Sequence, residues 1–166
     1  MKKLLLTAGV IVVVAAFAPA ALATKPAKGP VLASNLDFAP GELCPFGVSI
    51  RTVETKQFFL AFSNGVLETH GSFTVSVTNT NTQQTRYFNL PGMIRFEFLP
   101  NGIIRATGIG PTLSYLPTGA FLDNRPGALI YTDGRSVEVD DFSGPPFIVS
   151  FDVLSGNSEN LCETMA

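Results

Sequence analysis

The sequence has no tryptophan, one histidine and two cysteines among its 166 residues. His70 and the two cysteines fall short of the four ligands of a structural zinc site, so no metal is expected. Lysine and arginine number 11 against 13 acidic residues, which is not the basic excess that binding to phosphate backbones requires. The composition therefore argues against both a zinc protein and a nucleic-acid partner.

Motifs of catalysis and cofactor binding are missing as well. No serine lies in a Gly-x-Ser-x-Gly elbow, and Gly108-Ile109-Gly110-Pro111 lacks the helix and the lysine of a phosphate loop. Asp140, Asp141 and Asp152 lack the spacing of a calcium loop, and we interpret them as charges on a solvent face or at a turn. No cofactor is expected and no catalytic residue is assigned.

Residues 1–23 have the pattern of a helical signal peptide. Lys2 and Lys3 precede the apolar run Leu4–Phe17, and Ala21-Leu22-Ala23 fits a small-x-small cleavage site. The alternative is a membrane anchor, but the run is shorter than the roughly 20 apolar residues of a spanning helix. We therefore expect cleavage after Ala23, a secreted product and no membrane span after cleavage.

Residues 24–42 are rich in proline, alanine and lysine and show no apolar period. Such a composition is typical of a mobile segment. We expect a flexible tail over residues 24–42 and a single domain over residues 43–166, which is long enough for a hydrophobic core.

The period of the hydrophobic residues from Cys44 onward is two. Phe73, Val75 and Val77 alternate with serines and threonines, which predicts a strand with one wet face. Alternation or a short apolar run predicts further strands at 48–52, 56–62, 84–90, 94–98, 128–132, 137–140 and 147–153. No helix is expected after the leader.

Turn residues separate these segments. Asn64-Gly65, Asn101-Gly102 and Asp133-Gly134 suit two-residue hairpin loops, and Gly110-Pro111 predicts a further turn. The fold class is therefore all-β, with a single antiparallel domain. A small closed or nearly closed β-barrel of about eight strands is favoured because closure removes free edges, and a β-sandwich is the alternative.

Cys44 and Cys162 bracket nearly all of the predicted strands. Cysteines of an exported chain are expected to pair, and the alternative is two unpaired buried thiols. A disulfide that closes so long a loop restricts the unfolded chain by roughly 4–5 kcal/mol. Pairing also requires the first strand and the C-terminal segment to lie together.

The chain is rich in phenylalanine, with 14 residues of this type. A barrel interior lined by aromatic rings could hold a small apolar ligand, although rings that fill the interior themselves are the simpler interpretation of an eight-stranded barrel. The candidate ligand-binding residues are Phe58, Phe62, Phe73, Phe96, Phe98, Tyr115 and Phe121. Tyr115 and Phe121 lie in an irregular stretch that would form the mouth of the barrel.

His70 is two residues from Glu68, so the two side chains share one face of a strand. A carboxylate beside an imidazole can create a general base, but this face continues into serines and threonines, which favours a solvated charge pair. A barrel enzyme of the cyclase or isomerase kind stays possible. It would require a cavity in which some of a polar set converge, namely Glu68, His70, Tyr87, Arg95 and Glu97.

The succession of motifs resembles small exported proteins of actinobacteria that carry no assigned function. The resemblance is carried by Cys44-Pro45-Phe46-Gly47-Val48, Thr78-Asn79-Thr80, Asn101-Gly102, Pro126-Gly127, Asp133-Gly134-Arg135 and Leu161-Cys162. It implies export, an all-β fold and paired cysteines, and it implies no catalytic residues.

These observations predict an exported, non-enzymatic β-barrel protein that interacts with an envelope component or binds a small apolar ligand. The alternatives are the barrel enzyme described above and a cell-surface structural or adhesive module, which the threonine-rich sheet face would carry.

The cysteine pairing can be tested with a thiol reagent. Under denaturing, non-reducing conditions the mature protein is expected to show no reactive thiol, because both sulfurs are held in one bond. Two titratable thiols per chain would contradict the pairing, and the same assay after reduction provides the positive control.

Overall fold

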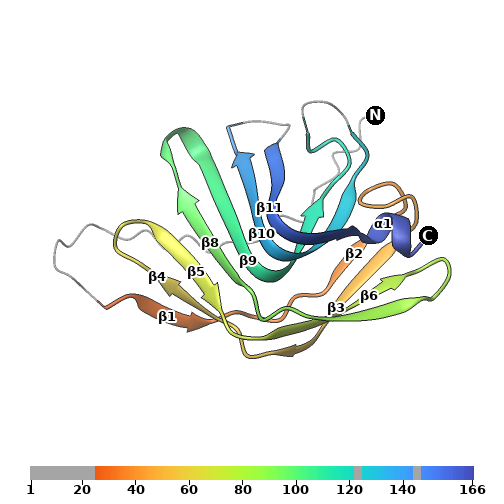
Figure 1. Ribbon diagram of the computed structural model, residues 1–166, viewed down its shortest axis with the longest axis horizontal. Helices are drawn as coiled ribbons and strands as arrows, with labels where there is room; N and C mark the ends of the chain where they lie inside the picture. The colour runs from red at the N-terminus through yellow and green to blue at the C-terminus, as the bar shows by residue number, and fades with distance from the viewer. Residues whose placement is uncertain (1–24, 122–124, 144–146) are drawn as a thin grey trace, which may run out of the picture.

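A computed structural model describes residues 25–121, 125–143 and 147–166. The predicted signal peptide lies outside these residues. Strands make up most of the described chain, which confirms the all-β class, and Figure 1 shows one short helix near the C-terminus. No helix of the described chain is long and apolar enough to cross a bilayer.

The strands form two antiparallel sheets, listed here in spatial order. The seven-stranded sheet contains β1 (Ala27–Pro30), β4 (Phe58–Ala61), β5 (Val66–His70), β8 (Met93–Phe98), β9 (Ile103–Leu116), β10 (Ala128–Asp141) and β11 (Ile148–Asn160). The four-stranded sheet contains β2 (Leu36–Phe38), β3 (Val48–Thr55), β6 (Phe73–Asn79) and β7 (Thr85–Asn89). A 3-10 turn at Pro100–Gly102 joins β8 to β9, and helix α1 (Leu161–Thr164) follows β11.

Three strands pass directly from one sheet into the other. Lys56 and Gln57 separate β3 from β4, Gly71 and Ser72 separate β5 from β6, and three residues separate β7 from β8. The amide of Lys56 donates to the carbonyl of Ser72 (2.9 Å), so the ladder continues across the corner. Pro91 and Gly92 therefore lie at a corner between the two sheets and not in a hairpin loop.

The main core lies between the four-stranded sheet and the far ends of β9 and β10. Leu113 of β9 and Leu129 of β10 pack against the inner residues of β3, β6 and β7, and α1 seals one side. Arg86 of β7 forms an ion pair with Glu159 of β11 (2.5 Å) and joins the two sheets at the surface. This packing is sandwich-like, as in the predicted alternative. The core residues from the four-stranded sheet are Val48, Ile50, Val75, Val77 and Phe88.

The predicted closed barrel is wrong. The outermost strands of the seven-stranded sheet are β1 and β11, and these two do not pair with each other in the described chain. The meander instead folds one part of the sheet over another, which buries apolar faces without closure. The free edge at β11 is interrupted by two bulges, whose extra residues are Val149 and Leu154. Bulges of this kind hinder edge-to-edge association.

The disulfide between Cys44 and Cys162 confirms the predicted pairing, with the two Cα atoms 5.1 Å apart. It fixes α1 against the segment that precedes β3. Nearby, the buried Asn79 donates from its side-chain amide to the carbonyl of Met165 (2.6 Å), while its carbonyl oxygen accepts from the amide of Asn81 (2.9 Å). Both ends of the domain are therefore held at the main core.

The expectation of a flexible tail is wrong for two stretches of residues 24–42. β1 pairs with β4 and β2 pairs with β3. Leu36 and Phe38 pack on the main core, and Asp37 between them forms an ion pair with Arg51 (2.6 Å). The alternation of Leu36, Asp37 and Phe38 was the signal for a strand, but it was too short to stand out from the prolines around it.

Two further strand predictions need correction. β9 occupies Ile103–Leu116, where only turn signals were recognised, and β10 is one strand where two were predicted. The glycines at Gly110-Pro111 and Asp133-Gly134 lie inside β9 and β10 and do not end them. The hairpin turns at Asn64-Gly65 and Asn101-Gly102 lie where predicted.

Three glycines inside strands form a line across β9, β10 and β11. Gly134 pairs with Gly110 on one side and with Gly156 on the other. A Cβ on Gly156 would lie 2.7 Å from the Cα of Gly134 and would also strike the carbonyl oxygen of Asp133. Gly110 and Gly156 have φ values of 83° and 85°, which favour glycine. Only glycine allows the backbones to approach so closely in this conformation.

The three strands bend sharply at this line. Residues four apart in an extended strand are about 13 Å apart. In β9, however, a Cβ on Gly108 would lie 3.1 Å from Oγ1 of Thr112, on the other side of Gly110. Figure 1 shows β9 descending to this point and then rising again. We call the bent part of β9, β10 and β11 the bend. Its inner face carries the side chains of the even-numbered residues of β9 and β10.

Replacing Gly156 with alanine tests the close approach. The variant Gly119→Ala is the control, because Gly119 has a similar φ of 75° with open space around its Cβ position. Both variants lose about 1–2 kcal/mol from the positive φ. We expect Gly156→Ala to lower the melting temperature at least twice as far as Gly119→Ala does in calorimetry. Equal losses would show that the strands can separate at the bend without cost.

Candidate functional site

A second hydrophobic core lies on the inner face of the bend. Leu116 of β9 and Ile148 of β11 come from opposite arms and pack together with Ala120 and Phe121 of the following connection. Phe121 forms a bridge with Ile148, whose amide donates to the carbonyl of Ala120 (2.8 Å). The connection after β9 therefore lies between the two arms of the bend.

Three hydroxyl side chains lie on the inner face near the glycine line. Thr132 has no exposed surface, Thr112 is 5% exposed and Ser136 is 4% exposed. Thr112 and Thr132 face each other across β9 and β10, and neither hydroxyl has a hydrogen-bond partner. Buried hydroxyls in folded proteins nearly always have a partner, so these two are unusual.

Two carboxyl groups follow on the same face of β10. Glu138 pairs with Ala106 and Phe151 on the neighbouring strands, and Asp140 lies opposite Ile104 and Ile148. Both carboxyls are thus surrounded by apolar side chains. Burial, and after it the neighbouring charge of Asp140, raise the pKa of Glu138 to about 8. Burial also raises the pKa of Asp140, to about 6, against a hydrogen bond from Glu138.

These shifts have a consequence for charge. A pair of adjacent carboxyls in an apolar setting holds one proton more readily than two charges. At neutral pH the pair therefore shares a proton and carries about one negative charge. None of the ion pairs between described residues involves Glu138 or Asp140.

The predicted ligand-binding residues fall into separate groups. Phe96 and Phe98 of β8 are aligned through β9 with Glu138 and Asp140, so they share the inner face of the sheet, and Phe121 belongs to the second core. Phe98 is the most exposed of these three rings. The structure therefore brings these three residues to the region of the carboxyl pair.

The other four candidates lie elsewhere. Phe73 and Tyr115 pack on the main core, where the Tyr115 ring lies 6.2 Å from that of Phe38 and burial raises the Tyr115 pKa to about 12. Phe58 stacks on His70 with ring centroids 5.8 Å apart, on the opposite face of the seven-stranded sheet. Phe62 is half-buried at the turn after β4.

The predicted polar set forms a row of charges on this opposite face. Glu68 accepts from His70 (3.0 Å) and from Arg95 (3.0 Å). Glu97 continues the row, 3.7 Å from Arg95 and 3.9 Å from Arg105. Glu68 is 14% exposed, the other side chains of the row are 31–48% exposed, and Tyr87 lies on β7 of the other sheet. The row fits a solvated charge ladder across three strands better than a catalytic group.

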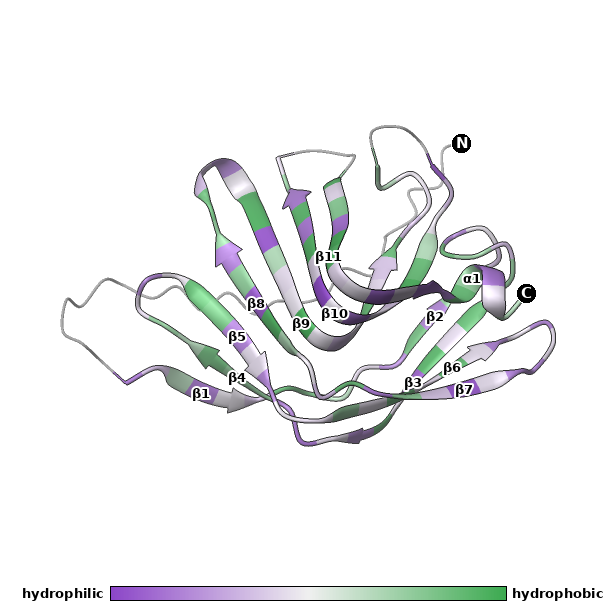
Figure 2. Ribbon diagram, viewed as in Figure 1, coloured by the Kyte–Doolittle hydropathy of each residue, from purple (hydrophilic) through white to green (hydrophobic). Residues whose placement is uncertain are grey.

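Sequence reasoning missed the carboxyl pair. It treated Asp140 as a solvent-face charge and did not select Glu138, because the adjacent Val137 and Val139 were taken as the buried side of the strand. In the structure Asp141 does serve a turn, accepting from the amide of Ser143 (2.8 Å), but Asp140 lies beside the second core. Figure 2 shows polar bands alternating with apolar ones along β8 and β10.

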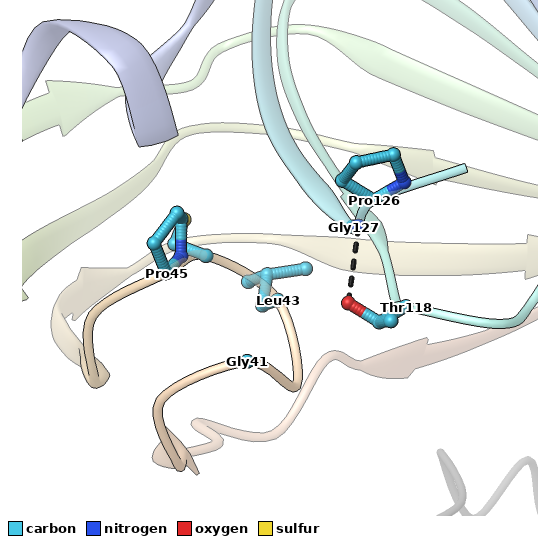
Figure 3. A pocket seen from close by; sticks show the side chains of 7 residues that line it. Gly41, Leu43, Pro45, Thr118, Pro126 and Gly127 are labelled. Carbon is cyan, nitrogen blue, oxygen red and sulfur yellow. Dashed lines mark hydrogen bonds between the residues drawn. The ribbon is translucent and has the colours of Figure 1, made fainter. Parts of the chain in front are cut away.

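A separate hollow of about 330 Å³ lies beside the disulfide. Figure 3 shows that Leu43 and Pro45 line one side, while Thr118 and Pro126 line the other. The amide of Gly127 donates to Oγ1 of Thr118 (3.1 Å), so the one side-chain hydroxyl of the hollow is already used. With no titratable side chain in its lining, the hollow offers less chemistry than the inner face of the bend.

Comparisons with protein-family models, with curated proteins and with solved structures find no match to this chain. The function must therefore be inferred from the residues themselves.

The carboxyl pair predicts a pH-dependent stability. Because the Glu138 pKa rises from 4.5 to about 8 on folding, its contribution is complete below about pH 4.5 and is lost as the pH rises through 8. We expect the melting temperature of the wild type to fall by about 5 °C or more between pH 5 and pH 8.5. Glu138→Gln, which cannot ionise, should flatten this fall in differential scanning calorimetry.

The control is Asp152→Asn. This residue is exposed, lies opposite Val137 on the other face of the sheet, and changes the net charge equally. A fall in melting temperature that persists in Glu138→Gln, or that disappears in Asp152→Asn, would contradict the assignment to the inner face.

Proposed function

We propose that this protein is an exported, non-enzymatic binding protein that holds a small, largely apolar ligand against the inner face of the bend. Export is supported by the leader-like residues 1–23 and by the disulfide between Cys44 and Cys162, a bond typical of oxidising compartments. The ligand class is the one predicted from the sequence, but the proposed site is a bent open sheet in place of a barrel interior.

The observation that carries the proposal is the pair of buried hydroxyls without partners. Leaving a buried polar group unpaired costs about 1–3 kcal/mol, so a fold rarely keeps two of them on one face without a use. Thr112 and Thr132 lie at the buried end of a face that also carries apolar side chains from β8, β9 and the second core. Small-molecule sites combine these features, with an apolar lining and a few polar groups that set the ligand's orientation.

An isomerase or cyclase is the second candidate, and the carboxyl pair favours it. A protonated Glu138 beside an ionised Asp140 would supply an acid and a base at neutral pH. Binding ranks first because it needs only the recognition groups already on the face. A self-associating surface module ranks last, since the bulges at Val149 and Leu154 interrupt the free edge of β11.

The hydrophobic dye 1-N-phenylnaphthylamine tests for ligand binding, because its fluorescence rises in an apolar site. We expect saturable binding to the mature wild type, and native mass spectrometry before and after solvent extraction should reveal any ligand retained from the producing cell. Ala106 faces Glu138 across the strands and is half-buried, so Ala106→Phe should fill the face and weaken dye binding about tenfold.

The matched variant is Arg105→Phe, which adds the same ring to the adjacent, exposed position on the opposite face. It should leave dye binding unchanged, and circular dichroism should confirm that both variants fold. A wild type that binds no dye, or equal binding by both variants, would contradict the proposed site.

A further inference from the structure

We propose that the ligand of the inner face is a primary amine with an apolar body, whose ammonium group lies at the carboxyl pair of Glu138 and Asp140. This inference rests on the proposed function and names its ligand class. The argument uses the charge of the pair, the hydrogen-bonding groups around it and the apolar side chains beside it.

Charge is the first argument. The carboxyl pair carries about one negative charge at neutral pH, and no lysine, arginine or histidine of the described chain forms an ion pair with it. A buried or half-buried charge without a partner is costly, and a bound cation of single charge would neutralise it. Beside the second core, the guanidinium of Arg125 lies over the ring of Phe121, 4.0 Å from its centroid.

A metal ion fits less well than an organic cation. Calcium takes six to eight oxygen ligands and zinc takes four ligands, usually with both carboxyls ionised. The described residues contain no group of three or more histidine, cysteine or acidic side chains that could hold a metal ion. A shared proton on the pair and apolar neighbours on both sides suit a monovalent ammonium instead.

The hydrogen-bonding groups favour a primary amine. A primary ammonium has three N–H donors and no acceptor. The inner face is rich in acceptors: it carries the two carboxyls and, towards the glycine line, the hydroxyls of Ser136, Thr112 and Thr132. The two unpartnered threonine hydroxyls belong to the same face, at its buried end near the glycine line. A quaternary ammonium could donate no hydrogen bond here.

The apolar body has a place beside the carboxyls. Across β9, Ala106 and Ile104 separate Glu138 and Asp140 from Phe96 and Phe98 on β8. Neighbouring strands are about 4.8 Å apart, so these rings lie about 10 Å from the carboxyl positions. That distance suits a chain of several methylene groups. Because Phe96 is only half-buried and Phe98 is exposed, the ligand would also cover apolar surface.

Four ligands with the same eight-carbon chain separate the arguments: octylamine, octanol, octanoate and octyltrimethylammonium. Each competes with 1-N-phenylnaphthylamine on the mature wild-type protein at pH 7.5. We expect octylamine to bind about tenfold more tightly than octanol, because it adds charge-assisted hydrogen bonds. Octanoate should bind most weakly. Octyltrimethylammonium should lack most of the tenfold gain in affinity that octylamine has over octanol.

The double variant Glu138→Gln, Asp140→Asn tests the location of the ammonium. It should weaken octylamine about tenfold and leave octanol unchanged, and it is expected to fold because it removes a buried charge. Glu138→Gln alone gives a second, milder test. The control is Asp152→Asn, which removes one exposed charge from the opposite face and should affect none of the four ligands.

The outcomes separate this inference from the proposed function. Equal binding of octylamine and octanol to the wild type, or loss of octylamine binding in Asp152→Asn, would overturn the amine assignment while leaving an apolar site. Failure of the dye and of all four ligands to bind would overturn the proposed function itself. Preference for octylamine that disappears only in the inner-face variants would support both.

Discussion

The close approach of the backbones at Gly134 and Gly156, with Gly110 in register beside them, is the constraint on which the rest depends. The glycines are in register across β9, β10 and β11, so all three strands bend along one line. The bend lets one part of the sheet cover the main core while the other part rises to enclose a second, smaller core. A side chain at the line would separate the strands, and the buried hydroxyls and the carboxyl pair would no longer share one enclosed face.

The alternation of polar and apolar residues was enough to locate most strands. It did not show which face of each strand packs against a core. At Glu138 and Asp140 the alternation with Val137 and Val139 suggested that the valines face the core and the carboxyls face solvent. Both faces are in fact half-covered, because β10 belongs to a sheet that packs on one side at one end and on the other side beyond the bend. A period-two pattern cannot reveal such a change of side.

Glycine caused the other failure of sequence reasoning. Gly110-Pro111 and Asp133-Gly134 have the chemistry of turns, and the same positive φ that makes a turn also makes a bend inside a strand. Without knowledge of the partner strands the two cannot be distinguished, and the barrel expectation followed from strands cut too short. Phe96 and Phe98 were selected because apolar rings on a half-wet strand are conspicuous, whereas Thr112 and Thr132 look like ordinary sheet residues.

The disulfide between Cys44 and Cys162 has a consequence for resistance to proteolysis. The bond encloses nearly every strand, so hydrolysis of any single peptide bond between the two cysteines leaves both pieces covalently joined. A nick at the exposed Asn64-Gly65 turn, for example, would open the chain without releasing a fragment. The two pieces would stay at a high effective concentration, so their strands could remain paired. Cleavage of the backbone therefore need not unfold the domain.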